Sequence, residues 1–191
     1  VAQRGTSVSG ITSTGTGYNT VDRFNFQLNT AGTWTESQST DVPSGQGFSS
    51  LLKIDCTTAN ASLGTGSYIV TQQRIEGQNV QMLKKGTSNA ESITFSFWVK
   101  SNKTGTYILE VRDQDNSRHI SQSYTINSAN TWEKKILTYP GDTTGAFDND
   151  NAQSLRPIFW LAAGSDFSSG TLATSWASTT LTNSAVGQVN L

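Results

Sequence analysis

The sequence predicts an all-β domain, folded as a sandwich or a barrel. Along most of the chain apolar and polar residues alternate with a period of two, which is the pattern of strands with one buried face. The alternating runs are short and regularly spaced, and Gly, Asn, Asp and Pro separate them. This spacing is typical of sandwiches and barrels, and 191 residues suit a single domain, 1–191.

Nine strands are expected, over residues 23–28, 33–38, 49–55, 67–75, 92–101, 106–113, 118–126, 132–139 and 155–162. Segments such as NTAG, PSGQG, DQDNS and YPGD lie between them and supply the backbone angles that reversals need. One short helix is expected in EGQNVQMLKKG (76–86), because Val80 and Leu83 lie three residues apart and Gly86 gives a C-terminal stop. Residues 163–191 are rich in Ser, Thr, Ala and Gly, and we expect extended chain lying over the sandwich.

The composition excludes several classes of function. Charged residues make up only 14% and the formal net charge is -1, so the basic surface that nucleic acid requires is missing. No apolar run approaches the roughly 20 residues that span a bilayer, so membrane insertion is not expected. With one cysteine, Cys56, an intrachain disulfide is excluded. The opening VAQRGTSVSG has no signal core and no initiator methionine, so we expect a fragment of a longer protein.

Particular stretches resemble a known family. The run ESITFSFWVKSNKTGTYILEVRDQDNSRHISQSYTINSANTWEKKILTY resembles the strand series of jelly rolls of the carbohydrate-binding-module, or galactose-binding-like, type. VAQRGTS, VDRFNF, LKKGTSNAES, FWVKSNKTGTY, GDTTGAFDNDNA, LAAGSDFSSGTL and AVGQVNL are similar to a domain of tail-fibre and other virion surface proteins of bacteriophages, particularly marine ones.

The resemblance implies a jelly-roll β-sandwich on a virion, at the tail fibre or particle surface, that presents a surface to a host-cell glycan. It brings no catalytic residues. In that family a further strand follows a VGQVNL segment, which here ends the sequence. The chain is therefore expected to lack its closing strand, or to have that edge covered by a neighbouring element.

The alternation also predicts a candidate binding face. Ile93, Phe95, Phe97 and Val99 share one phase, and Trp98 falls in the other, polar phase. When the alternation is carried to the neighbouring strands, one sheet face is expected to gather Gln72, Arg74, Trp98, Glu110, Arg112 and Trp160. An indole stacks on the C–H face of a sugar ring, and guanidinium, carboxylate and amide groups hydrogen-bond its hydroxyls. These residues predict a carbohydrate site; the alternative is that Trp98 and Trp160 are buried under the N-terminal segment or the helix.

The loop GDTTGAFDNDNAQS suggests a second site. Asp142, Asp148 and Asp150 offer oxygen ligands of the kind that a structural Ca²⁺ prefers. The spacing does not fit an EF-hand, since Gln153 stands where that loop requires Gly. A solvated turn stabilised by Asp and Asn side chains is the alternative.

Catalysis is not expected. His119 follows a hairpin turn as a solvated strand-end histidine, and no G-x-S-x-G motif accompanies it. A glycosidase needs two facing carboxyl groups, and Glu110 has no acidic neighbour by strand phase. Two alternatives to a binding role stay open: a structural spacer or assembly domain of a tail fibre or capsid, and a polysaccharide-degrading tailspike domain. The expected partners are a host glycan and other virion subunits in a homotrimer, which would multiply weak sites.

Overall fold

The computed structural model describes residues 5–13 and 16–191, so the first four residues of the stretch VAQRGTS lie outside it. The chain is nearly all β, as predicted. Its strands are β1 (Ser7–Ile11), β2 (Phe24–Asn29), β3 (Thr33–Ser39), β4 (Leu51–Thr58), β5 (Tyr68–Gln73), β6 (Ile75–Glu76), β7 (Ile93–Val99), β8 (Gly105–Asp113), β9 (Arg118–Ile126), β10 (Glu133–Tyr139), β11 (Gln153–Ala163) and β12 (Ala177–Ser178).

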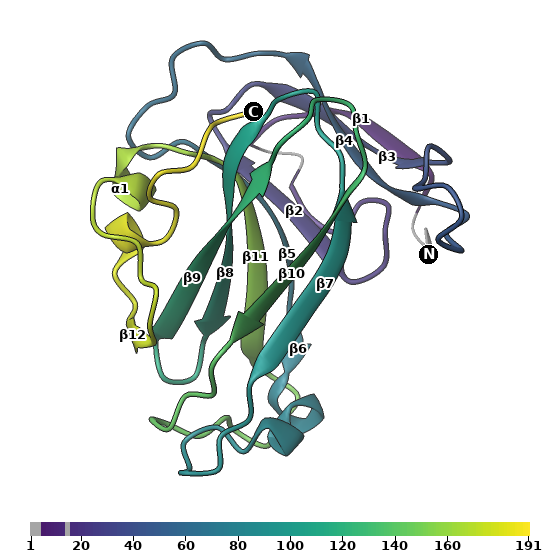
Figure 1. Ribbon diagram of the computed structural model, residues 1–191. Helices are drawn as coiled ribbons and strands as arrows, with labels where there is room; N and C mark the ends of the chain where they lie inside the picture. The colour runs from purple at the N-terminus through teal and green to yellow at the C-terminus, as the bar shows by residue number, and fades with distance from the viewer. Residues whose placement is uncertain (1–4, 14–15) are drawn as a thin grey trace.

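The strands form two layers. The large sheet has the order β12-β9-β8-β11-β5-β2, with β6 also paired to β11. Two small sheets, β10-β7 and β1-β3-β4, pack on one face of it, which we call the inner face. All the pairs are antiparallel. In Figure 1, β7 and β10 cross in front of the large sheet, and β1, β3 and β4 lie at its upper end.

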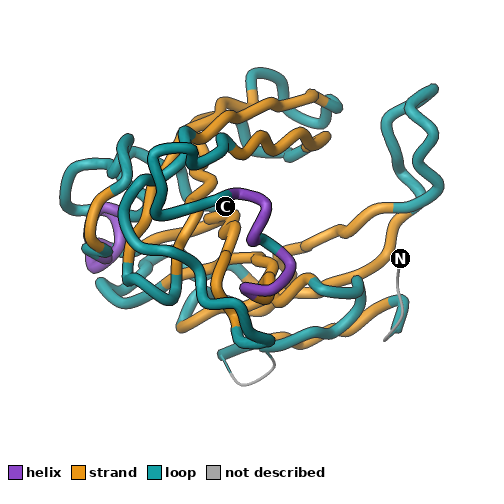
Figure 2. The backbone as a smooth tube through the Cα atoms, turned by 90° about the horizontal axis from the view of Figure 1, so that it is seen from below, coloured by secondary structure: helices purple, strands orange, loops and turns teal. Residues whose placement is uncertain are grey.

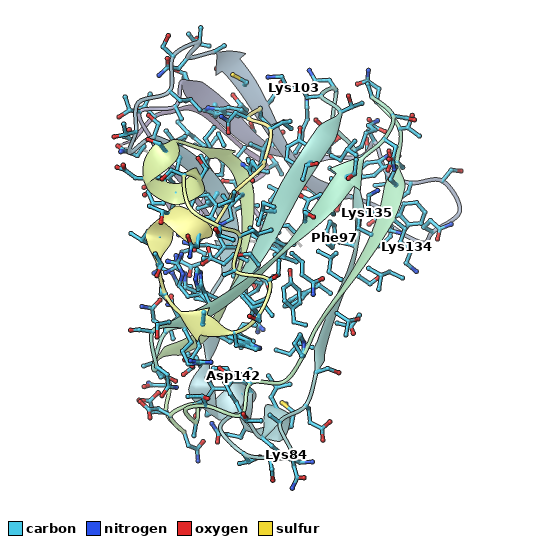
Figure 3. The ribbon with its side chains drawn as sticks, turned by 60° about the vertical axis from the view of Figure 1, so that its left-hand side comes forward. Lys84, Phe97, Lys103, Lys134, Lys135 and Asp142 are labelled. Atoms are coloured by element: carbon cyan, nitrogen blue, oxygen red, sulfur yellow. The ribbon has the colours of Figure 1, made fainter. Side chains whose placement is uncertain are left out.

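The main core lies between the β7–β10 pair and the inner face of the large sheet. Four residues of β7 pack into it, which confirms the predicted buried phase: Ile93, Phe95, Phe97 and Val99. Figure 3 shows Phe97 between the two layers of strands, where its ring meets that of Tyr124 edge-on at 5.2 Å between centroids. Such edge-to-face pairs add specificity to the burial of aromatic area.

Other apolar clusters pack the remaining faces. Phe26, Trp34 and Ile69 belong to a cluster between the β1-β3-β4 sheet and the large sheet. On the opposite, outer face of the large sheet, a third cluster that includes Ile158 and Trp160 is buried beneath the C-terminal segment, residues 164–191. This segment, yellow in Figure 1, lies along one side of the large sheet. The expectation that it covers the sandwich is confirmed.

Helical turns form where one short helix was expected, but they are 3₁₀ turns and not an α-helix. Residues 76–86 form two single 3₁₀ turns, η1 (Gly77–Asn79) and η2 (Gln81–Leu83), because Val80 between them leaves helical backbone angles at φ -124° and ψ 9°. The one short α-helix among residues 5–13 and 16–191 is α1 (Ser165–Ser168), and a further 3₁₀ turn, η3 (Leu181–Asn183), follows it. Figure 2 shows these turns in purple among predominantly orange strands. None of the helices in the described residues is long and apolar enough to cross a membrane.

Candidate functional site

Four of the six predicted binding residues meet on the outer face of the large sheet. Ile158 of β11 stands between Gln72 of β5 and Glu110 of β8, and the next outward-facing residues along the sheet are Arg112 and Trp160. Arg74 follows β5 and is exposed. It is close enough to the same face for its charge to repel that of Arg156. Gln72, Glu110, Arg112 and Trp160 are therefore assembled as expected, with Arg74 at the margin.

Trp98 does not join them, so the prediction of one shared face was wrong for this residue. It lies on β7, opposite Lys134 of β10, and both strands belong to the small sheet on the other side of the main core. Alternation fixes which way a side chain points from its own sheet. The outer faces of the two layers of a sandwich point in opposite directions, so a shared outward phase does not bring Trp98 and Trp160 together.

Trp160 is buried rather than displayed. Its exposed fraction is 3%, and it belongs to the cluster beneath the C-terminal segment. Its indole Nε1 donates a hydrogen bond of 2.9 Å to Oε2 of Glu110, and its ring lies 5.3 Å from that of Phe167 on α1. The alternative of a buried tryptophan therefore holds for Trp160, although the covering chain is C-terminal and not N-terminal.

Glu110 is the acceptor at the centre of a buried network. Its carboxylate accepts hydrogen bonds from Arg112 Nη2 at 2.8 and 3.0 Å, from Arg112 Nε at 3.1 Å and from His119 Nδ1 at 2.9 Å. Burial alone would raise the pKa of Glu110, but the hydrogen bond from His119 and the charge of Arg112 outweigh it and hold this pKa below its ordinary value. Glu110 is therefore an ionised group with both oxygens engaged.

His119 is buried too, which corrects the expectation of a solvated strand-end histidine. One ring nitrogen contacts Glu110, and the other, Nε2, accepts a hydrogen bond from the backbone N–H of Thr180 at 3.4 Å. These contacts place the ring proton on Nδ1. With both nitrogens engaged, the histidine orients Glu110 and links β9 to the C-terminal segment.

A pocket of about 170 Å³ opens beside this network, between the outer face and the C-terminal segment. Its apolar walls are Tyr68, Val70, Ile158, Trp160, Phe167 and Leu181. Its polar groups are Gln27, Arg112 and Arg156. The rings of Tyr68 and Phe167 meet edge-on with centroids 5.4 Å apart, and both side chains are only partly buried. The pocket therefore joins partly exposed aromatic rings to guanidinium groups.

Arg156 stands directly opposite Arg112 across the β8–β11 ladder. Its Nε and Nη2 donate to Oε1 of Gln72, at 3.0 and 2.5 Å, and its Nη1 donates to Oε1 of Gln114 at 3.2 Å. Burial, followed by repulsion from Arg112 and Arg74, lowers the pKa of Arg156 to about 10. The guanidinium is still protonated at neutral pH.

The predicted calcium residues do not converge on a site. The carboxylate of Asp142 is held by Lys85 Nζ at 3.2 Å and by Arg118 Nε at 2.6 Å, so two cations already neutralise it. Asp150 accepts a hydrogen bond from the backbone N–H of Ala152 at 2.9 Å. This is a turn stabilised by an Asp side chain, the alternative to a calcium site. Within the described ranges, no group of three or more His, Cys, Asp or Glu is placed to hold a metal ion. Figure 3 shows Asp142 at the lower end of the molecule, near Lys84.

Sequence reasoning missed several residues that form the pocket. Tyr68 and Arg156 could have been predicted from the alternation, because Tyr68 shares strand phase with Gln72 and Arg156 shares it with Trp160. Phe167 and Leu181 come from the C-terminal segment, where no period relates one residue to the next. Their position depends on how that segment packs on the sheet.

No protein-family model matches the chain, and no curated protein matches it. Among solved structures, the enzymatically active domain of tailspike protein 4 of bacteriophage CBA120 aligns with 72% of this chain and 17% of that chain. The sequence identity is 19% and the TM-score is 0.45. The alignment thus spans less than a fifth of the tailspike chain, and a likeness of this degree assigns neither a fold nor a function.

Proposed function

We propose that the chain is a non-catalytic carbohydrate-binding domain of a bacteriophage virion protein, in a tail fibre or elsewhere on the particle surface, and that it binds a host-cell glycan. The resemblance of its sequence stretches to virion surface proteins supports the setting. The observation that carries the binding role is the pocket on the outer face, where aromatic rings and guanidinium groups line one small cavity.

The pocket has the two kinds of group that a sugar ring needs. Tyr68 and Phe167 offer partly exposed aromatic surface for the C–H face of the ring. Gln27, Arg112 and Arg156 supply amide and guanidinium groups for its hydroxyls. The sequence predicted a sugar that contacts an aromatic ring and planar hydrogen-bonding groups. In the pocket, Tyr68 and Phe167 provide the aromatic contact that was expected from Trp98.

The size of the pocket indicates the mode of binding. About 170 Å³ is well below the roughly 300–1,000 Å³ of pockets for drug-sized ligands. We expect the site to take a single sugar residue, at a chain end or as a branch, and to bind it weakly. Several copies on one virion would then raise the overall affinity through effective concentration.

A glycan array tests this function. An array of neutral, carboxylated and sulfated oligosaccharides is read with the intact chain and with Tyr68→Ala, and we expect binding that falls about tenfold in the variant, as for loss of an aromatic anchor. If Tyr68→Ala retained every wild-type signal, the binding site would lie outside this pocket. Absence of any signal from the wild-type chain, folded and at high density, would reject carbohydrate binding.

The non-catalytic part of the proposal rests on Glu110. A glycosidase acid must be protonated and free to reach the glycosidic oxygen. Glu110 is ionised, and its oxygens accept from Arg112, His119 and Trp160. We therefore expect no release of reducing ends from any oligosaccharide that the array identifies, and steady release would support the degrading alternative.

An assembly role is the second candidate, and the outer face of the β7–β10 pair favours it. Ile136 of β10 is 61% exposed and lies on the same outward face as Trp98. Exposed apolar side chains of this kind mark contact surfaces when they adjoin one another. Sedimentation of the chain and of Ile136→Lys tests this: an oligomer that the variant abolishes would support assembly through this face, and a monomer at all concentrations would exclude it.

A further inference from the structure

We infer that the pocket selects a sugar that carries an acidic group, bound by the unused N–H groups of Arg156 beside Arg112. The inference rests on the proposed carbohydrate binding and adds the class of ligand. An acidic group here means a carboxylate, as in a uronic acid, or a sulfate or phosphate ester.

The first observation is the pairing of two like charges. Arg156 and Arg112 are directly opposite residues on neighbouring antiparallel strands. Such positions bring side chains within a few ångströms, and like charges directly opposite each other destabilise a sheet. Arg74 adds a third cation whose charge acts on Arg156. The outer face therefore holds a concentration of positive charge in a chain whose formal net charge is -1.

The second observation is that the protein neutralises only one of the pair. Arg112 has the carboxylate of Glu110 at 2.8 Å. Arg156 contacts the amide oxygens of Gln72 and Gln114, and no carboxylate in the described part of the chain lies within 4.0 Å of it. The two charged side chains that line the pocket are both arginines. The charge of Glu110 favours Arg156 only without direct contact. A guanidinium that is largely withdrawn from water without a directly paired carboxylate is an electrostatic cost that an anionic ligand would relieve.

The third observation is that Arg156 has unused donors. The guanidinium of Arg156 has five N–H groups, of which Nε and one N–H on each terminal nitrogen are engaged by Gln72 and Gln114. One N–H on Nη1 and one on Nη2 have no acceptor among the described residues. Guanidinium N–H groups are strong donors to the oxygens of a carboxylate or a sulfate. Gln72 and Gln114 fix the rest of the group, so little side-chain entropy is left to lose on binding.

The test compares sugars that differ only in charge. Titration calorimetry measures trigalacturonate against its methyl ester, and a sulfated galactose oligosaccharide against its unsulfated form. We expect each acidic probe that fits to bind at least tenfold more tightly than its neutral partner, and added salt to weaken only the acidic one. The two pairs separate a carboxylate from a sulfate as the source of the charge.

Two variants assign the effect to Arg156. Arg156→Gln removes the charge, and Gln72→Glu keeps Arg156 but gives it a carboxylate partner at the same atoms that now hold it. Both should abolish the preference for the acidic probe, and Gln72→Glu preserves the test if Arg156→Gln does not fold. Equal binding of acidic and neutral probes by the wild-type chain would overturn the inference while leaving carbohydrate binding intact. No binding of these probes or of any array sugar would overturn both.

Discussion

Arg156 and Arg112 face each other across β11 and β8, and only Arg112 has a carboxylate partner. On the β8 side the positive charge of Arg112 is therefore paired with the carboxylate of Glu110, which also accepts from His119. On the β11 side the charge of Arg156 has no such partner. This asymmetry separates two roles on one face of the sheet. Glu110 links β8, β9 and β11 beneath the C-terminal segment, and Arg156 is the group that we propose for ligand binding.

The asymmetry predicts that Gln72→Glu stabilises the protein. The new carboxylate would accept from Arg156 at the positions where the amide oxygen accepts now, and Asn25 can turn its amide to keep its bond to residue 72. A charge-assisted bond replaces a neutral acceptor, so the free energy of unfolding should rise by about 1 kcal/mol. Urea unfolding measures this. A lower midpoint in the variant would show that a carboxylate partner for Arg156 does not stabilise the protein.

Glu110→Gln should have the opposite effect. It leaves Arg112 without its carboxylate in a buried site, and breaking a buried pair in this way costs about 3–5 kcal/mol. The matched control is Glu91→Gln, which removes an exposed partner of Lys84 and should leave the urea midpoint unchanged. Equal midpoints for the two variants would mean that the buried network contributes little to stability.

The same carboxylate predicts a pH dependence. The pKa of Glu110 in the folded protein lies below its ordinary value of 4.5, so its contribution to stability is complete above that value and is lost as the pH falls towards the folded pKa. The difference in unfolding free energy between the wild-type chain and Glu110→Gln should therefore shrink on acidification below about pH 4.5. Urea unfolding from neutral to strongly acid pH provides the test, and a difference that stays constant would contradict this assignment.

Gly164 is predicted to set the position of the pocket wall. A Cβ at this residue would lie 2.2 Å from the carbonyl oxygen of Gly64 and 2.3 Å from that of Thr65, so Gly164→Ala must move the start of α1, and Phe167 with it. We expect a loss of about 1–3 kcal/mol in stability together with weaker ligand binding. Gly5→Ala, whose Cβ would meet only an ordinary contact at 3.7 Å, is the control. Wild-type behaviour of both variants would exclude this role for Gly164.

Much of the fold could be predicted because strand periodicity is local. Residues 118–126 were expected as a strand and form β9 with the same ends, and the buried phase of β7 was confirmed at Phe97. The choice of sheet is not local, which is why Trp98 was assigned to the wrong face. The walls contributed by α1 and η3 depend on how a segment without periodicity packs, so Phe167 could not be found from its neighbours in the sequence.

The indole N–H signals of the five tryptophans in a ¹⁵N NMR spectrum report directly on a sugar site at the outer face of the large sheet. Trp160 lines the pocket, and Trp98 lies on the other layer. After assignment by single Trp→Phe variants, the spectrum is recorded with the array oligosaccharide that binds most strongly. We predict that the Trp160 signal shifts in a saturable way while the Trp98 signal stays in place. A saturable shift of the Trp98 signal with the Trp160 signal unchanged would place the sugar on the other layer and rule out the proposed site.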